Sequence, residues 1–342
     1  MCAKKDNLIN IAAVQPPKPR FCVPFASDTN LKSIADTANK NLERTMGLID
    51  QAAGRGAKVV CTPENVTGVG VWADEDGSLF RASVKSINSE ALDRFCEQAN
   101  RLGIYTIACL YLAEGNDIYN CGVLIGPNGK IMGTYKKTHL PASERHHITA
   151  GNEYPVFETE FGRVGILICY DMHFPEPVRC LALNGADIVF HPTIGLSFGG
   201  GPNLMLDRVK VRAFDSAVWI VVAHNADING LGKWWCGSSM IVNPLGEIIA
   251  DAGTAKDTIV MANIDPKGGR DLELDYSHSG VLDWRKRMNA ERCPDSYSVL
   301  SDNSPPVCKE GGKVIFKKPE EIAELTKQEA ANGRFEYCRQ EW

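Results

Sequence analysis

The chain has 342 residues, of which 44% are hydrophobic, and it carries a formal net charge of -5. This composition predicts a folded protein with a large core, and the acidic balance argues against a basic face for nucleic acid. No apolar run is long enough to cross a bilayer, and the twelve scattered cysteines include no C-x-x-C pair. We therefore expect a reduced, cytoplasmic protein without a disulfide framework, a metal site or a membrane partner.

Strand-like and helix-like segments alternate in the first half of the chain. Apolar residues at helical spacing over 42–53 predict one helix, which Gly54 ends. A second helix is predicted over 89–102 with Ser89 as its N-cap, and residues 126–129 predict a turn between two strands. The strands predicted in this half cover residues 9–15, 58–62, 104–112, 117–125 and 130–136.

The second half continues the same alternation. Helices are predicted over 175–184 and 204–216. The predicted strands cover residues 156–159, 163–168, 188–191, 218–224, 239–242, 248–251 and 258–264. Propensity and pattern alone indicate an α/β protein, and the mixture of hairpins with strand–helix units suggests two mixed sheets face to face with helices outside.

Three residues with reactive or ionisable side chains follow predicted buried strands. Cys169 stands at the exit of one strand, where an exposed thiol is well placed to be a nucleophile. A base and a positive charge must lie nearby if the thiol is to react near neutral pH. Glu64 and Lys137 follow two other strands, and they suit the roles of proton acceptor and oxyanion donor. Together these groups would suffice for amide hydrolysis through a thioester without a metal or cofactor.

The contexts of these residues resemble a known family. Pro63-Glu64, the block YKKTHLP at 135–141, the block CYDMHFPE at 169–176 and the late hairpin at 237–246 are similar to those of the nitrilase (carbon–nitrogen hydrolase) superfamily. The resemblance runs from about residue 10 to residue 300 and favours the amidase and carbamoylase branch. It implies a four-layer α-β-β-α sandwich of two mixed sheets.

The resemblance also implies site residues. The family's catalytic glutamate, lysine and cysteine carry over onto Glu64, Lys137 and Cys169. Many members have a second glutamate soon after the lysine, and Glu144 is the best candidate here, with the role of positioning Lys137 and the substrate amide. Glu153 and Glu158 are the alternatives.

Residues near the three strand ends complete the predicted site. Tyr170 offers a backbone N–H as a second oxyanion donor, while Trp72 and Thr193 lie in or at the start of loops that should rim the site. Loop 228–236 is a third candidate rim. His173 stands where related members often carry arginine, so no carboxylate-binding role is expected at that position.

The residues after the nucleophile distinguish the possible activities. Nitrile-hydrolysing members usually have Cys-Trp-Glu, whereas this chain has Cys169-Tyr170-Asp171. We therefore expect hydrolysis of a small amide or N-carbamoyl compound with release of ammonia. The alternatives are a nitrilase that converts a nitrile to acid and ammonia, and a non-catalytic binding or assembly protein on the same fold.

The predicted domain boundary lies near residue 300. Residues 1–300 would form the hydrolase domain, and residues 301–342 a C-terminal extension that begins with a linker-like run and contains a short polar helix after Pro319. The extension is either a solvated tail or an arm that crosses to a partner subunit. Its aromatic residues and the family resemblance favour a homodimer or a higher homo-oligomer.

Overall fold

A computed structural model describes residues 8–22, 24–71, 77–141, 144–194, 201–226, 237–274, 280–305 and 318–332. Trp72 and the predicted rim loop 228–236 lie outside these residues. No helix in the described part of the chain combines the length and apolar composition that a bilayer span requires.

The first sheet has six strands in the order β12-β1-β2-β3-β4-β5. Its three central strands, β1 to β3, are parallel, and the strands on either side are antiparallel to their neighbours. Parallel neighbours need crossover segments, which the helices supply. The strands are β1 (Ile9–Gln15), β2 (Val59–Cys61), β3 (Tyr105–Glu114), β4 (Asp117–Ile125), β5 (Ile131–Lys136) and β12 (Thr258–Ile264).

The second sheet repeats this arrangement with the order β11-β10-β9-β8-β7-β6. Here β7 to β9 are parallel, and the flanking strands are again antiparallel to their neighbours. β2 and β8 are therefore the middle parallel strands of their sheets. The strands are β6 (Val156–Thr159), β7 (Gly162–Ile166), β8 (Ile188–Pro192), β9 (Trp219–Ala223), β10 (Met240–Val242) and β11 (Ile248–Asp251).

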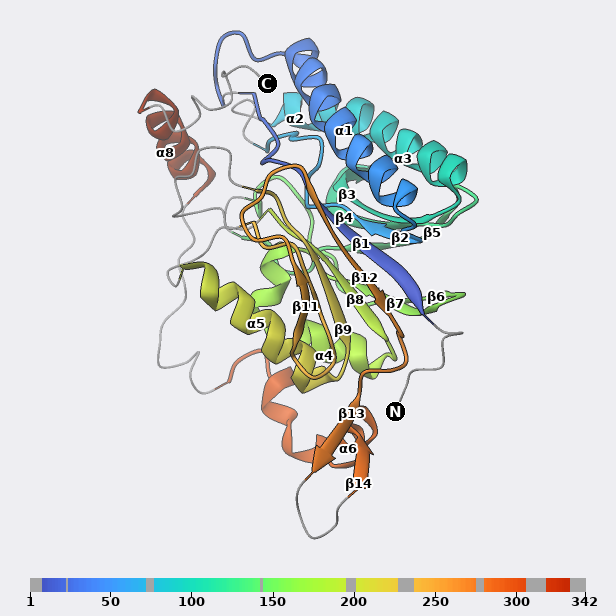
Figure 1. The fold of residues 1–342 in the computed structure, drawn as a ribbon. Coiled ribbons are helices and arrows are strands. Elements are labelled where there is room, and N and C mark those ends of the chain that lie inside the picture. Colours follow the sequence, from blue (N-terminus) through green and yellow to red (C-terminus); the bar gives the residue numbers. More distant parts are fainter. Residues whose placement is uncertain are drawn as a thin grey trace.

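The two sheets pack face to face, and the predicted four-layer sandwich is confirmed. Helices α1 (Leu31–Gly54) and α3 (Ser89–Leu102) cover the outer face of the first sheet, and α4 (Glu176–Leu183) and α5 (Gly201–Ser216) lie on the outside of the second (Figure 1). Alternate residues of β1 show the layers, because Ile11 and Ala13 join the core between the sheets while Ala12 and Val14 face the helices. Apolar burial on both faces explains why these strands read as continuous hydrophobic runs.

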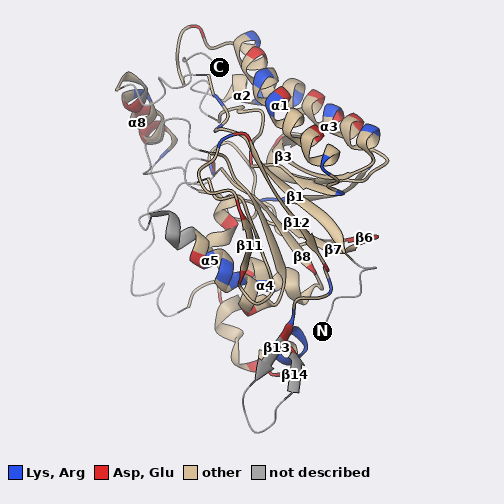
Figure 2. Ribbon diagram, viewed as in Figure 1, with Lys and Arg blue, Asp and Glu red and all other residues tan. Residues whose placement is uncertain are grey.

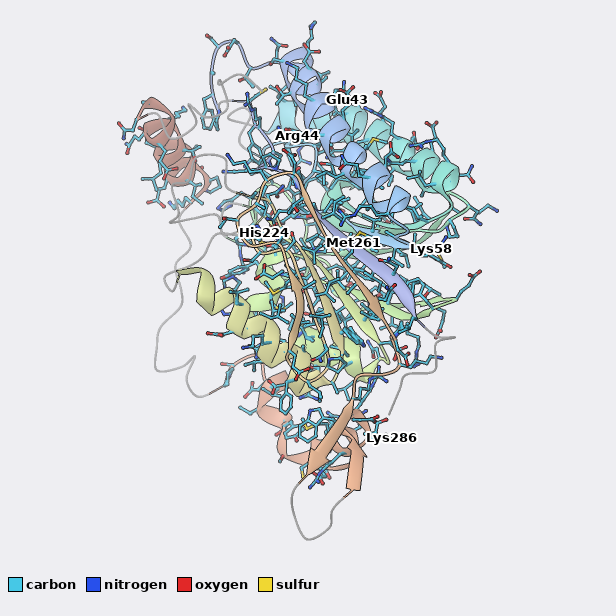
Figure 3. All side chains as sticks on the ribbon, viewed as in Figure 1. Glu43, Arg44, Lys58, His224, Met261 and Lys286 are labelled. Carbon is cyan, nitrogen blue, oxygen red and sulfur yellow. The ribbon has the colours of Figure 1, made fainter. Side chains whose placement is uncertain are left out.

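Charged residues occupy the outside of these layers. Figure 2 shows lysine, arginine, aspartate and glutamate of both signs along α1 and α3, while the strands between the helix layers carry few of them. In Figure 3 the side chains of Glu43 and Lys58 lie at the outside of the fold, and His224 lies within its body. Glu43 and Lys58 are exposed and His224 is fully buried.

One predicted helix start is wrong. Ser89 does not cap a helix, because α2 (Ser78–Ser83) and a π-helical turn at 84–88 run directly into α3. Phe80 and Val84 of this segment are fully buried. Their burial stabilises a helix that the weak local pattern did not reveal.

The sequence did not indicate a two-stranded hairpin, β13 (Asp271–Leu274) and β14 (Gly280–Asp283), or the helix that follows it, α6 (Trp284–Ala290). Helix α8 (Pro319–Ala331) matches the short helix predicted after Pro319. Arginines before the hairpin and in α6 reach the same buried carboxylate. The Asp187 Oδ1 atom accepts from Arg270 Nη2 at 2.9 Å and from Arg285 Nη1 at 3.0 Å.

We predict that Asp187→Asn destabilises the fold by about 3 kcal/mol, because it leaves two largely buried guanidinium groups without their anion. Urea unfolding followed by tryptophan fluorescence measures this change. Asp257→Asn is the matched control, since the Arg44–Asp257 pair is about 40% exposed and should contribute less than about 1 kcal/mol. Equal losses in the two variants would contradict the anchoring role of Asp187.

Candidate active site

The turn after β7 presents Cys169. The strand ends at Ile166, and Cys169 begins a short 3-10 helix, η3 (Cys169–His173), with φ of 44°. A cysteine rarely adopts this left-handed conformation, so the surrounding contacts must hold the turn. The prediction of an exposed thiol at a strand exit is wrong in this respect, because Cys169 is only partly exposed.

Asp171 holds this turn against the segment that follows β5. Its carboxylate is fully buried, and its Oδ2 atom accepts from the Ile168 backbone N–H at 2.9 Å and from the Tyr135 hydroxyl at 2.7 Å. Its Oδ1 atom accepts from the His139 backbone N–H at 2.9 Å and from the Thr138 hydroxyl at 3.0 Å. Asp171 therefore ties the nucleophile turn of the second sheet to residues 135–139 of the first.

Several donors keep Asp171 ionised. Burial disfavours its charge, but hydrogen bonds from His139, the Ile168 N–H and Tyr135, together with the charge of Lys137, outweigh burial and lower its pKa. A carboxylate that accepts this many hydrogen bonds is a rigid anchor.

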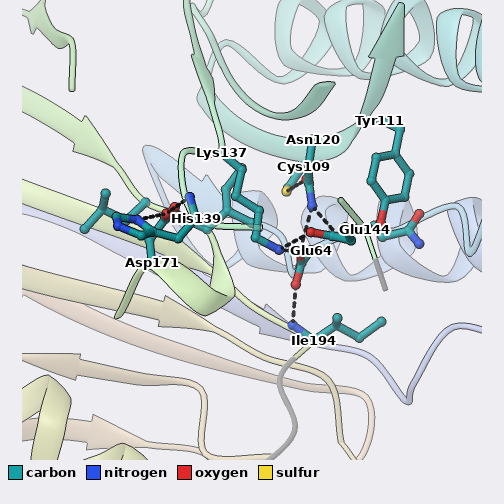
Figure 4. Close-up of polar contacts among 12 residues, drawn as sticks. Glu64, Cys109, Tyr111, Asn120, Lys137, His139, Glu144, Asp171 and Ile194 are labelled. Atoms are coloured by element: carbon teal, nitrogen blue, oxygen red, sulfur yellow. Dashed lines mark hydrogen bonds and ion pairs between the residues drawn. The ribbon is translucent and has the colours of Figure 1, made fainter. Parts of the chain in front are cut away.

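Lys137 lies at the end of β5 between two carboxylates. Its ammonium Nζ is 2.8 Å from Glu64 Oε1 and 2.9 Å from Glu144 Oε2, and all three side chains are almost completely buried (Figure 4). A Cβ atom on Gly151 would lie 2.2 Å from the Lys136 carbonyl oxygen, so only glycine fits beside this strand end. The structure thus brings Glu64, Lys137 and Glu144 together, as predicted.

Two residues that sequence reasoning missed complete this cluster. Asn120 Nδ2 donates to Glu64 Oε1 at 2.7 Å and to Glu144 Oε1 at 3.2 Å, and the Tyr111 hydroxyl donates to Glu144 Oε1 at 2.7 Å. Tyr111 on β3 and Asn120 on β4 are directly opposite each other in the sheet. The only sequence signal was a polar residue, Asn120, inside an otherwise apolar strand.

The single lysine sets the ionisation of the pair of glutamates. Burial raises the pKa of Glu64, but Lys137 and hydrogen bonds from Lys137, Cys169 and Asn120 lower it below the usual value. Burial and the charge of Glu64 together raise the pKa of Glu144 despite Lys137. Burial disfavours the Lys137 ammonium, yet the two carboxylates raise its pKa well above the usual value.

Glu64 also contacts the nucleophile and the end of β8. Its carboxylate acts on the Cys169 thiol, and so does the Thr193 side chain. Glu64 Oε2 accepts from the Ile194 backbone N–H at 3.2 Å. Thr193 is buried, and its side chain is one of the groups that lower the pKa of Cys169. Cys169 therefore has a neighbouring carboxylate that could act as its base.

The resting thiol is protonated. Burial and the negative charge of Glu64 raise the pKa of Cys169 above its usual value, although Lys137 and the Thr193 hydrogen bond oppose this. Lys137 does not outweigh these effects, because this one cation is shared with two carboxylates. A reaction at this thiol would have to remove its proton, and Glu64 is the neighbouring carboxylate that could accept it.

The remaining predicted residues lie in different places. The Tyr170 ring packs against His173 at 4.8 Å and Phe174 at 5.5 Å between ring centroids. Glu153 and Glu158 are exposed and do not join the cluster, so Glu144 is the second glutamate there. Trp72 lies outside the described residues. Within the described ranges, no group of three or more histidine, cysteine, aspartate or glutamate residues is arranged to hold a metal ion.

Comparisons with known proteins agree with this architecture. A model of the carbon–nitrogen hydrolase family matches residues 10–273. A nitrilase of Pyrococcus abyssi is 32% identical over 229 residues, which make up 66% of this chain and 84% of that protein. The omega-amidase NIT2 of Danio rerio is 30% identical over 274 residues, which make up 76% of this chain and 92% of that protein.

A solved structure shares the fold. The crystal structure of a carbon–nitrogen hydrolase from Helicobacter pylori G27 superposes with a TM-score of 0.68 at 22% identity. The match covers 86% of this chain and 98% of that one. At this level of identity the likeness concerns the arrangement of strands and helices.

The pH dependence of Cys169 alkylation tests the arrangement. Because the pKa of the thiol is raised, reaction of a free thiolate would increase only in alkaline solution, whereas a route through Glu64 persists until Glu64 is protonated at low pH. Asn120→Ala removes a hydrogen bond that lowers the pKa of Glu64, so we expect the acid limb of that route to move to higher pH. Mass spectrometry of iodoacetamide labelling between about pH 3 and pH 10 measures this.

Asn39→Ala is the control for this variant, since Asn39 is exposed on α1 and contacts Arg94. Its acid limb should match that of the unmodified chain. An unshifted acid limb in Asn120→Ala would show that Asn120 does not tune Glu64.

Proposed function

Because the chain belongs to the carbon–nitrogen hydrolase family, it is a hydrolase of carbon–nitrogen bonds other than peptide bonds, and we propose that its substrates are small amides or N-carbamoyl compounds. The observation that carries this proposal is the Cys169 thiol beside Glu64, whose carboxylate accepts a hydrogen bond from the buried Lys137 ammonium. Nucleophile, base and cation are thus within reach of one carbonyl group.

In the first step the Cys169 sulfur attacks the substrate carbonyl carbon while Glu64 accepts the thiol proton. The carbonyl π electrons move to oxygen, which becomes an oxyanion. Lys137 donates two of its three ammonium protons to Glu64 and Glu144, and its third N–H, which no described residue takes, is available to the oxyanion. The Tyr170 backbone N–H is the proposed second donor.

In the second step the tetrahedral intermediate collapses. The carbon–nitrogen bond breaks, and the protonated Glu64 gives its proton to the departing nitrogen, so that ammonia leaves and a Cys169 thioester remains. Glu64 then takes a proton from water as the water oxygen attacks the thioester carbon. The carbon–sulfur bond breaks, the thiol regains its proton, and the acid is released.

Glu144 has a different task in this scheme. It contacts Lys137, Asn120 and Tyr111, whereas Glu64 contacts the thiol. We propose that Glu144 orients the Lys137 ammonium and the substrate amide and does not exchange the thiol proton. The same residues could also carry out the alternative nitrilase reaction. The similarity to the Pyrococcus abyssi nitrilase supports that alternative.

The size of Asp171 supports the amide over the nitrile. Nitrile-hydrolysing members usually carry a longer glutamate at this position, and here both oxygens of the fully buried Asp171 are engaged by donors at 2.7–3.0 Å. A binding or assembly protein would have no need for a buried lysine with two carboxylates, since burying such charges is costly. We therefore propose an amidase or carbamoylase activity.

Substitution of the site residues tests the mechanism. We expect Cys169→Ala to release no ammonia from short amides and to keep its thermal melt, because only the nucleophile is lost. Lys137→Ala removes the oxyanion donor and should lower kcat by ~10²–10³. Cys180→Ala is the matched control, since Cys180 on α4 is also a partly buried free thiol. Substantial turnover by Cys169→Ala would sink the proposed mechanism.

We also propose a homo-oligomer in a reducing compartment such as the cytoplasm. The eight described cysteines are all free thiols. Large apolar side chains are exposed on α4, on α5 and just before the C-terminal extension. These residues are Leu183, Val211, Val299 and Leu300. Their exposure supports an interface between copies on this side of the second sheet.

For this interface we expect Val211→Glu combined with Leu300→Glu to lower the molecular mass in light scattering, because two charges would then be buried between subunits. Ile131→Glu is the control, because Ile131 is 50% exposed on β5 of the other sheet. A mass that changes in neither protein would contradict an interface at α5.

A further inference from the structure

Arg208 is a half-buried cation whose partner carries no opposite charge. It lies on α5, and its Nη1 atom is 3.1 Å from Nδ1 of His173. Within the described residues, no carboxylate lies within ion-pair distance of its guanidinium group. Removing a charge partly from water without a counter-ion is unfavourable, so a ligand anion would stabilise this group.

His173 is held in its neutral form by this contact. A guanidinium group only donates hydrogen bonds, so the His173 Nδ1 atom must accept and cannot carry a proton. Burial lowers the pKa of His173 to about 4, and the charges of Arg208 and Lys137 contribute to the shift. The imidazole therefore orients the guanidinium group without neutralising it.

This pair lies next to the nucleophile. His173 ends η3, the short helix that Cys169 begins, and α5 packs against that helix. The His173 ring contacts the ring of Tyr170, the residue after the nucleophile. Arg208 contacts the His173 ring directly, whereas Lys137 acts on this ring only through its charge.

The cations differ in what they can offer a ligand. Lys137 is shared by Glu64 and Glu144, so the catalytic cluster carries one negative charge in excess when both glutamates are ionised. That cluster would repel a substrate carboxylate. Arg208 is outside the cluster and is the charge that could hold such a group with two parallel N–H···O bonds.

We propose that Arg208, oriented by His173, binds a carboxylate of the substrate, so that the preferred substrates are short amides or N-carbamoyl compounds that carry a carboxylate. This inference rests on the proposed amide hydrolysis. It assigns specificity to a residue of α5, which no motif of the sequence singled out.

The selectivity between matched substrates tests it. The substrates are the mono-amides of succinic and glutaric acid and their neutral methyl esters, and the readout is the ratio of kcat/KM for each acid to that for its ester. Arg208→Gln should lower this ratio by about 10- to 100-fold, because a charged hydrogen-bond partner is lost. Arg208→Lys, which keeps the charge without the planar fork, should give a smaller loss.

Lys210→Gln is the matched control, since it removes a cation from an exposed position of the same helix. Its ratio should equal that of the unmodified chain. A ratio that Arg208→Gln leaves unchanged, in a protein that still hydrolyses the esters' amide bond, would overturn the carboxylate site and leave the proposed hydrolysis standing.

A binding measurement tests the anion site at Arg208 independently of amide hydrolysis. Glutarate should slow iodoacetamide labelling of Cys169 in the unmodified chain more than neutral glutaramide does, and Arg208→Gln should abolish the difference. If no amide is hydrolysed but this protection depends on Arg208, the anion site is supported and the hydrolysis proposal fails. Equal protection by the two compounds in the unmodified chain would overturn the anion site.

Discussion

The buried ammonium of Lys137 between Glu64 and Glu144 is the constraint on which the rest of the site depends. An ammonium group 2.8 Å from one carboxylate and 2.9 Å from another in a largely dry interior is tolerable only if the remaining hydrogen-bonding capacity of these groups is satisfied. Asn120 and Tyr111, on the β3–β4 hairpin, donate the hydrogen bonds that the two carboxylates still need. Because one cation serves two carboxylates, it cannot also turn Cys169 into a thiolate, and this is why the proposed mechanism moves the thiol proton during attack.

The site is assembled across the two sheets. The first sheet carries Glu64, Lys137 and their donors, while the second carries Cys169 and Thr193 at the ends of its parallel strands. Asp171 links the halves, because one buried carboxylate binds both the turn before Cys169 and the segment after Lys137. The geometry of the reacting groups therefore depends on how the sheets pack, and the core between them has a direct part in the proposed chemistry.

The sequence predicted the parts of this molecule that local pattern determines. Strands 9–15 and 117–125 were predicted with the bounds that the structure has, since most of their residues are apolar. Glu64, Lys137 and Cys169 were found because each follows a buried strand within a recognisable block, and the family resemblance is confirmed. Asn120 and Tyr111 were not found, because only strand register brings them to Glu64 and Glu144. The hairpin after Arg270 was missed for the same reason, since Asp187 anchors its flanks through tertiary contacts.

The covalent intermediate gives the most direct test of the account. The unmodified chain would be mixed with an excess of a short amide, quenched in acid within the first turnovers, and its intact mass and Cys169 peptide measured. The account predicts an added mass equal to the substrate minus ammonia, located on Cys169. Ammonia release without any adduct on Cys169, or with the acyl group on another residue, would contradict it.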